Sequence, residues 1–210
     1  MMLLHNMTSL EKDILKELMN IILAKAADSF AKISKEEVLI NVPELKEAES
    51  KTALEELLIQ NNVEVLIQSE IKGDIYAHTL LLFSDEHMDK VESVFFKRIQ
   101  PSKKMRESLL LEWSNILTGT MVTHLANFLK VNIYGSVPMQ PIYRDYLKGD
   151  ELLLDLDVSR PVLFTVNALF MPSESQISLP MILIFDIPNM EKVLNLIREI
   201  NKDDFRLLKL

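Results

Sequence analysis

Two pairs of polar residues have a spacing that could support chemistry: Glu17 with Asn20, and Glu112 with Asn115. Residues three apart on a helix lie on the same face, one turn apart. An ionised carboxylate only accepts hydrogen bonds, whereas a carboxamide donates and accepts, so it can hold and orient a water molecule. One such pair is usually a solvated helix face. Its recurrence favours a functional interpretation, because asparagine is a mediocre helix former and needs another reason to stand there.

The chain contains two copies of one unit. A shift of 95 positions places one Glu-x-x-Asn pair on the other and Pro43 on Pro138. Farther along, a shift of 102 places Leu80 on Ile182. The change of shift predicts about seven additional residues in the loops of the second copy. Self-similarity of this kind indicates a repeated structural unit.

Each unit begins with a long helix. Apolar residues recur at steps of three and four across 8–33 and 104–129, which is typical of an amphipathic helix. Thr8 and Glu11 form a capping-box sequence at the start of the first one. These helices would carry the two Glu-x-x-Asn pairs.

Strands and a shorter helix follow in each unit. Residues 63–71 and 75–83 have the pattern of a hairpin, with Lys72-Gly73-Asp74 at its turn. Residues 44–61 could be a helix or a loop. The remaining expected elements are the β-branched runs Val38–Val42 and Val131–Val137, each followed by a proline that ends the strand, second-copy strands within 151–158, 161–171 and 177–186, and closing helices over 86–98 and 189–199.

This order of elements predicts an α+β fold. We expect two pseudo-symmetric helix-strand-strands-helix repeats, forming one compact domain with a mostly antiparallel sheet. The domain would span residues 1–210, with repeats of about 8–99 and 103–200.

Composition excludes several classes of function. The 210 residues include no cysteine, so a disulfide scaffold, a thiolate metal site and a cysteine nucleophile are ruled out. Four scattered glycines cannot form a P-loop or a dinucleotide-binding turn. A formal charge of −8 disfavours nucleic acid as a partner. The N-terminus does not look like a signal peptide and no apolar run could span a bilayer, so we expect no membrane association and a cytoplasmic protein.

The full spacing around each polar pair resembles a known signature. It reads Asp/Ser-x3-Glu-x2-Asn-x22-Pro, and it is similar to the signature of the CheC/CheX/FliY phosphatases of bacterial chemotaxis. Two intact copies in a chain near 200 residues look closest to CheC. The two copies are Asp13, Glu17, Asn20 and Pro43, and Ser108, Glu112, Asn115 and Pro138.

The resemblance implies a phosphatase that hydrolyses the aspartyl phosphate of a CheY-like response regulator. Asn20 and Asn115 would orient the attacking water. Glu17 and Glu112 would accept a charge-assisted hydrogen bond from a lysine of the receiver domain. The resemblance leaves Asp13, Ser108, Pro43 and Pro138 in supporting positions. The receiver would supply Mg²⁺, and this chain would bind no metal or cofactor of its own.

Two other interpretations stay open. The chain could be a non-catalytic binding module of the same fold that docks a receiver domain or a CheD-like deamidase. It could also be a purely structural two-fold repeat, which the paired asparagines argue against. Loss of phosphate from a phosphorylated receiver, with and without the protein, separates an enzyme from a module.

A glycine in the second helix indicates that the two sites differ in their importance for activity. Gly119 lies one turn after Asn115, where we expect a neighbouring element of the fold to approach the helix backbone closely. The first helix has Ala24 in the same place. On this basis, the sequence predicts that Asn115 matters more to activity than Asn20.

Overall fold

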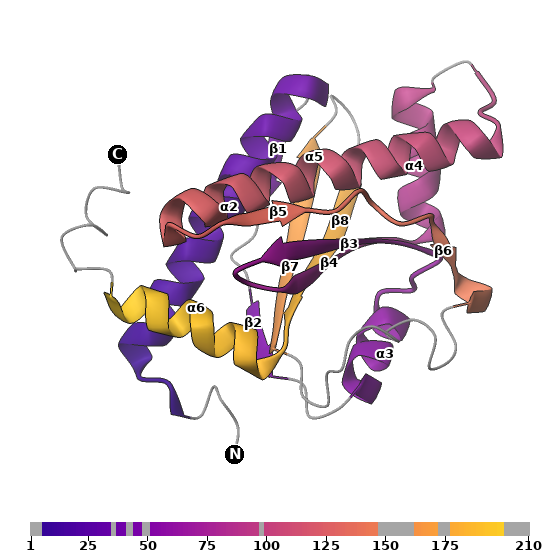
Figure 1. The fold of residues 1–210 in the computed structure, drawn as a ribbon. Coiled ribbons are helices and arrows are strands. Elements are labelled where there is room, and N and C mark those ends of the chain that lie inside the picture. The colour runs from indigo at the N-terminus through magenta and orange to yellow at the C-terminus, as the bar shows by residue number, and fades with distance from the viewer. Residues whose placement is uncertain are drawn as a thin grey trace.

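A computed structural model describes residues 6–34, 37–40, 44–47, 51–96, 99–146, 162–171 and 177–199. Figure 1 shows their helices and strands in order along the chain. The helices are α2 (Ser9–Ser34), α3 (Lys51–Gln60), α4 (Asp85–Phe95), α5 (Lys103–Leu129), α6 (Ile187–Glu199) and the short 3₁₀ turn η1 (Arg144–Tyr146). The strands are β1 (Glu37–Ile40), β2 (Glu44–Glu47), β3 (Val65–Gly73), β4 (Ala77–Phe83), β5 (Ile133–Gly135), β6 (Ile142–Tyr143), β7 (Val162–Met171) and β8 (Ile177–Phe185).

The fold class predicted from the sequence is confirmed. The described strands form one eight-stranded sheet, and every pairing among them is antiparallel. Both long helices, the hairpin and the two closing helices form where the pattern predicts them. Residues 44–61, left open above, divide into β2 and α3. The strand expected within 151–158 lies outside the described residues.

The strand order is symmetric about its centre. It runs β1-β7-β8-β4-β3-β5, so each unit's hairpin pairs on its outer side with the first strand of the other unit. The hairpins meet where β4 pairs with β8, and Leu80 lies directly opposite Ile182 there. These two residues are equivalent under the 102-residue shift, so the pseudo-two-fold axis passes through this pair.

Strand registers locate the additional residues of the second copy. Ile40 pairs with Ala168, and its equivalent Gly135, 95 positions later, pairs with Ile71. These pairings make Ile71 equivalent to Ala168, a shift of 97. Two additional residues therefore precede Ala168, and five more lie within the β7–β8 hairpin, between Ala168 and Ile182. Not all of the additional residues lie in loops as predicted, because β7 and β8 are themselves longer than β3 and β4.

The two long helices bury the same positions. Each buried residue of α2 has a buried equivalent in α5, 95 positions later. The α2 set is Leu15, Leu18, Met19, Ile22, Leu23, Ala26 and Ala27, and the α5 set is Leu110, Trp113, Ser114, Leu117, Thr118, Met121 and Val122. Because Glu and Asn are absent from both sets, the same face of each helix turns its polar pair away from the core.

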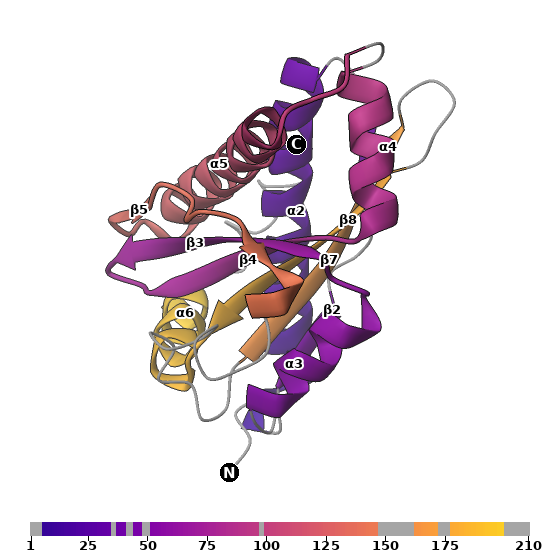
Figure 2. The same cartoon turned by 90° about the vertical axis from the view of Figure 1, so that its right-hand side faces the viewer.

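The sheet separates two layers of apolar side chains. Alternate residues of β3 and β4, such as Ile67 and Leu81, join the main core with α2, α4, α5 and α6. The opposite face, including Leu66 and Leu80, packs with Leu58 of α3 in a smaller cluster. Figure 2 shows α5 and α3 on opposite sides of the sheet, with α2 beside α5. None of the helices in the described ranges is both long and apolar enough to cross a bilayer.

Buried hydroxyl groups join α5 to the hairpin beneath it. The Oγ atoms of Ser69 and Ser114 lie 3.2 Å apart, and the Oγ1 atoms of Thr79 and Thr118 lie 3.1 Å apart. All four residues are buried. At the equivalent positions of α2 stand the apolar residues Met19 and Leu23, so this polar contact distinguishes one half of the molecule from the other.

The Thr79–Thr118 contact gives a stability prediction. Thr118→Val alone should lower the free energy of unfolding by about 1–3 kcal/mol, because it leaves the Thr79 hydroxyl buried against a methyl group. Adding Thr79→Val should recover part of that loss, since two apolar groups of matching shape then face each other. Urea unfolding of both single variants and the double variant measures the coupling. If the double variant loses as much free energy of unfolding as the two single variants together, Thr79 and Thr118 are not coupled and the prediction is wrong.

Candidate functional site

The first turn of each long helix is fixed by a cap. In α2 the Thr8 backbone N–H donates to Glu11 Oε2 (2.8 Å), and the Glu11 N–H donates to Thr8 Oγ1 (3.2 Å), which confirms the predicted capping box. In α5 the N-cap residue Ser102 accepts from the Met105 N–H. These contacts satisfy backbone donors that have no partner within a helix.

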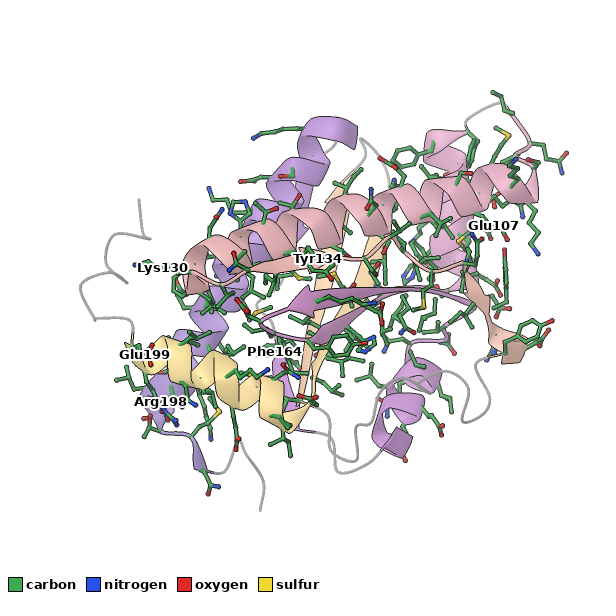
Figure 3. The ribbon with its side chains drawn as sticks, viewed as in Figure 1. Glu107, Lys130, Tyr134, Phe164, Arg198 and Glu199 are labelled. Atoms are coloured by element: carbon green, nitrogen blue, oxygen red, sulfur yellow. The ribbon has the colours of Figure 1, made fainter. Side chains whose placement is uncertain are left out.

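Ion pairs connect each first turn to a closing helix. Arg198 of α6 donates to Glu11 at 2.6 Å, and this hydrogen bond lowers the pKa of the Glu11 carboxyl. Arg106 of α5 lies 2.8 Å from Glu92 of α4. Figure 3 shows Arg198 beside the first turn of α2. The ion pair has opposite polarity in the two halves, because Glu11 and Arg106 are equivalent under the 95-residue shift.

A further contact holds the start of α5. Tyr143 of β6 donates its hydroxyl to Glu107 Oε1 (2.7 Å), and Lys103 lies 4.7 Å from the centre of the same ring. Burial and the neighbouring carboxylate raise the pKa of Tyr143 to about 12, so the phenol stays protonated. Figure 3 shows Glu107 near the start of α5 and Lys130 at its other end. The Glu-x-x-Asn pair lies between these two ends, on a helix whose start is anchored to the sheet.

The polar pair of α5 faces outward. Glu112 and Asn115 are both exposed, whereas Trp113 and Ser114 between them are buried. The Trp113 ring packs edge-to-face on Phe95 with centroids 4.9 Å apart, which holds this part of the helix in place. The buried residues thus fix the direction in which the polar pair projects.

The polar pair of α2 is less open. Glu17 and Asn20 are half-buried, neither reaching the core. The sequence predicted that both pairs would lie exposed on the surface. That is confirmed for α5 and only partly met for α2, which contacts both α5 and α6.

The side chains of both polar pairs lack hydrogen-bond and ion-pair partners in the described part of the chain. Across the ranges that the structure describes, no hydrogen bond or ion pair engages the side chains of Glu17, Asn20, Glu112 or Asn115. Their carboxylates and carboxamides are therefore available to an external group. Within the same ranges, no three potential metal ligands lie together.

The four supporting residues differ in their exposure and in whether the structure describes them. Asp13 and Ser108 are exposed, one turn before their glutamates on the same faces. Pro138 is half-buried in the segment after β5, where Ser136 N–H donates to Glu70 and Met139 N–H donates to Gln68. Pro138 interrupts these contacts with β3 because it has no N–H. Pro43 lies outside the described residues.

The expected close approach at Gly119 is wrong. In the described part of the chain, no atom outside its own helical turn comes within 4 Å of the place where a Cβ would stand. Gly119 is exposed, because α5 packs on the sheet through its opposite face, with Thr118. The predicted ranking of the two sites therefore loses this argument. Sequence reasoning missed that the glycine extends the open surface beside Asn115, although a glycine within a regular helix was a signal.

The chain is similar to known proteins in both sequence and fold. A model of the CheC-like family matches residues 10–47, which contain the first copy of the spacing. A comparison with curated protein sequences gave no match. The structure of Thermotoga maritima FliY is similar at 14% identity and a TM-score of 0.68, over 91% of this chain and 97% of that one.

Two other solved structures are similar. The middle domain of FliM from H. pylori matches at 8% identity and a TM-score of 0.61, over 90% of this chain and 99% of that one. A CheX chain, crystallised as a CheX-CheY-BeF3-Mg²⁺ complex from Borrelia burgdorferi, matches at 16% identity and a TM-score of 0.53, over 80% and 97%. At these identities the structures show the shared fold. Together with the family-model match, they confirm the predicted resemblance to the CheC/CheX/FliY family.

The exposed pair should add little to stability. Glu112→Ala and Asn115→Ala should each leave the free energy of unfolding within about 0.5 kcal/mol of the parent, because neither side chain has an internal partner. The matched control is Trp113→Ala in the same turn, which should cost about 3–5 kcal/mol. Urea unfolding followed by circular dichroism measures all three. A loss above about 1 kcal/mol for Asn115→Ala would instead assign that residue a structural role.

Proposed function

We propose that this chain is a phosphatase that hydrolyses the aspartyl phosphate of a CheY-like response regulator. The observation that carries the proposal is the repeated Glu-x-x-Asn pair. The pairs stand at equivalent positions of α2 and α5, turned away from the core, with no side-chain partner in the described residues. Mid-helix asparagines that contribute nothing to the fold are best explained by an external substrate.

In this proposal Asn20 and Asn115 position water. Hydrolysis of an acyl phosphate needs a water molecule in line with the bond that breaks. A carboxamide accepts one hydrogen bond from that water and can donate another to the phosphoryl group, without removing a proton itself. The gain comes from fixing the water in the attacking geometry.

Glu17 and Glu112 dock the receiver domain. An ionised carboxylate one turn from the asparagine can accept a charge-assisted hydrogen bond from a lysine of the partner. That contact would orient the phosphorylated aspartate toward the neighbouring asparagine. The receiver brings the Mg²⁺ that neutralises the phosphoryl oxygens, so the chemistry needs no metal site on this chain.

The comparisons support a receiver as the partner. The family model covers the first pair, and the second pair is its structural equivalent. One protein of similar fold, CheX of Borrelia burgdorferi, is found in complex with CheY.

A second candidate function is binding without catalysis. The fold is also that of the FliM middle domain of H. pylori, and one similar FliM chain, with a TM-score of 0.63, is found in a FliG–FliM complex. A chain of this fold could therefore dock a receiver, or a CheD-like deamidase, and leave the phosphate intact. Turnover of the phosphate separates this candidate from the first.

Dephosphorylation tests the role of the asparagines. A purified CheY-like receiver, phosphorylated by a small-molecule donor in Mg²⁺ buffer, should lose phosphate faster with the parent protein. Combining Asn20→Ala with Asn115→Ala should slow this loss on the order of 100-fold, because the water is no longer positioned. Binding of the receiver should stay nearly unchanged. An unaltered rate in the double variant would contradict the assignment.

Charge reversal tests the role of the glutamates. Glu112→Lys, in an Asn20→Ala background that leaves only the α5 site, should weaken receiver binding at least tenfold, because two cations then face each other. Titration of the receiver, loaded with beryllium fluoride and Mg²⁺, measures the affinity. Lys104→Glu, at an exposed position two turns earlier on α5, is the matched control and should leave the affinity within about twofold. An affinity that rises in Lys104→Glu as much as it falls in Glu112→Lys would indicate a general charge effect instead of a specific contact.

A further inference from the structure

Gly119 has no reason within the fold to be glycine. It stands in the middle of the 27-residue helix α5, where glycine is the poorest helix former after proline. The chain shows a positive φ at Gly73 and none at Gly119, so a left-handed backbone does not require it. No described neighbour would meet a Cβ there, so close packing does not require it either.

The glycine lies on the face that carries the polar pair. It is four residues after Asn115 and seven after Glu112, which places all three residues in one row along the helix. All three are exposed. The next residue of the row, Thr123, donates its hydroxyl to the Gly119 carbonyl at 2.8 Å. Beside Asn115 the outer surface of α5 is therefore bare backbone, with the Thr123 hydroxyl folded back onto it.

A bare helical turn permits an approach that any side chain would prevent. Without a Cβ, another polypeptide backbone can come into van der Waals contact with the helix backbone. Four residues correspond to about 6 Å of rise, so a chain crossing at Gly119 passes one turn from the Asn115 carboxamide. In α2 the equivalent row has Ala24, whose methyl group stands on an exposed position, and its polar pair is half-buried.

We propose that Gly119 is a positioning residue of the α5 site: the receiver domain crosses α5 there, backbone against backbone, and the phosphoryl group thereby reaches Asn115. The proposal rests on the proposed function and adds the place and closeness of the contact. Alanine at position 119 would stabilise helix α5. The glycine is therefore explained by contact with the receiver and not by the stability of the fold. It also makes the α5 site more accessible to a receiver than the α2 site. This ranking rests on the open surface at Gly119 and no longer on close packing of a neighbouring element of the fold, which the structure excludes.

The test separates helix stability from docking. In an Asn20→Ala background, which leaves the α5 site alone, Gly119→Ala should raise the urea midpoint of unfolding by roughly 0.3–1 M. It should nevertheless weaken binding of a receiver loaded with beryllium fluoride and Mg²⁺ by roughly tenfold, the effect of an overpacked methyl group. Gly119→Leu should weaken binding further, and phosphate release from the phosphorylated receiver should fall in the same order.

Asn127→Ala is the matched control. Asn127 is exposed on the same helix, two turns beyond Gly119, and alanine there should also stabilise the helix. Its affinity for the receiver should equal that of the background. If both Gly119 variants bind the receiver with full affinity, and the Asn20→Ala protein itself binds and dephosphorylates it, this inference is overturned. The proposed phosphatase function would be unaffected. A background and parent protein that neither bind nor dephosphorylate a receiver would overturn the proposed function, and this inference with it.

Discussion

The antiparallel pairing of β4 with β8 is the contact on which the architecture depends. It joins the two hairpins at the Leu80–Ile182 pair and makes one continuous sheet from two units. Each hairpin then accepts the first strand of the other unit on its outer edge: β7 accepts β1, and β3 accepts β5. Because of this exchange, neither unit can complete its sheet alone. Both long helices are therefore positioned by the whole sheet, because the first strand of each unit, which contacts that unit's long helix, pairs with the hairpin of the other unit.

The symmetry holds in the backbone and is relaxed in the side chains. Both long helices bury the same seven positions, yet α5 meets its hairpin through buried hydroxyl groups and α2 has apolar residues at the equivalent places. The ion pairs that secure the first turns have exchanged acid and base between Glu11 and Arg106. Such changes preserve a contact while altering its chemistry. They leave two Glu-x-x-Asn pairs at equivalent helix positions, exposed on α5 and half-buried on α2.

The residues of the proposed function and the residues that stabilise the fold lie on different faces of the same helix. The inner face of α5 packs Trp113 and Leu117 into the core, while the outer face presents Glu112 and Asn115 without internal partners. Residues of the outer face can therefore be selected for an external partner at little cost to the fold. Gly119 extends this separation, since it lowers helix propensity on a face where nothing internal compensates for the loss.

Local pattern and self-similarity were enough to predict much of this protein. Periodicity located α2 and α5, the Thr8–Glu11 sequence predicted its capping box, and the repeat predicted an antiparallel sheet with two-fold symmetry. The Glu-x-x-Asn spacing placed its residues on one face, because helical geometry is fixed by sequence separation alone.

Only the tertiary structure decided how far each face is open. The sequence indicates that Gly119 permits close approach, but whether an internal element uses that space depends on which face of α5 meets the sheet. The exchange of first strands, the contact of Ser114 with Ser69 and the partial burial of Asn20 depend likewise on residues far apart in the chain. Sequence spacing determines the direction of a side chain on its own helix. What lies opposite that side chain is determined by the packing of all the elements together.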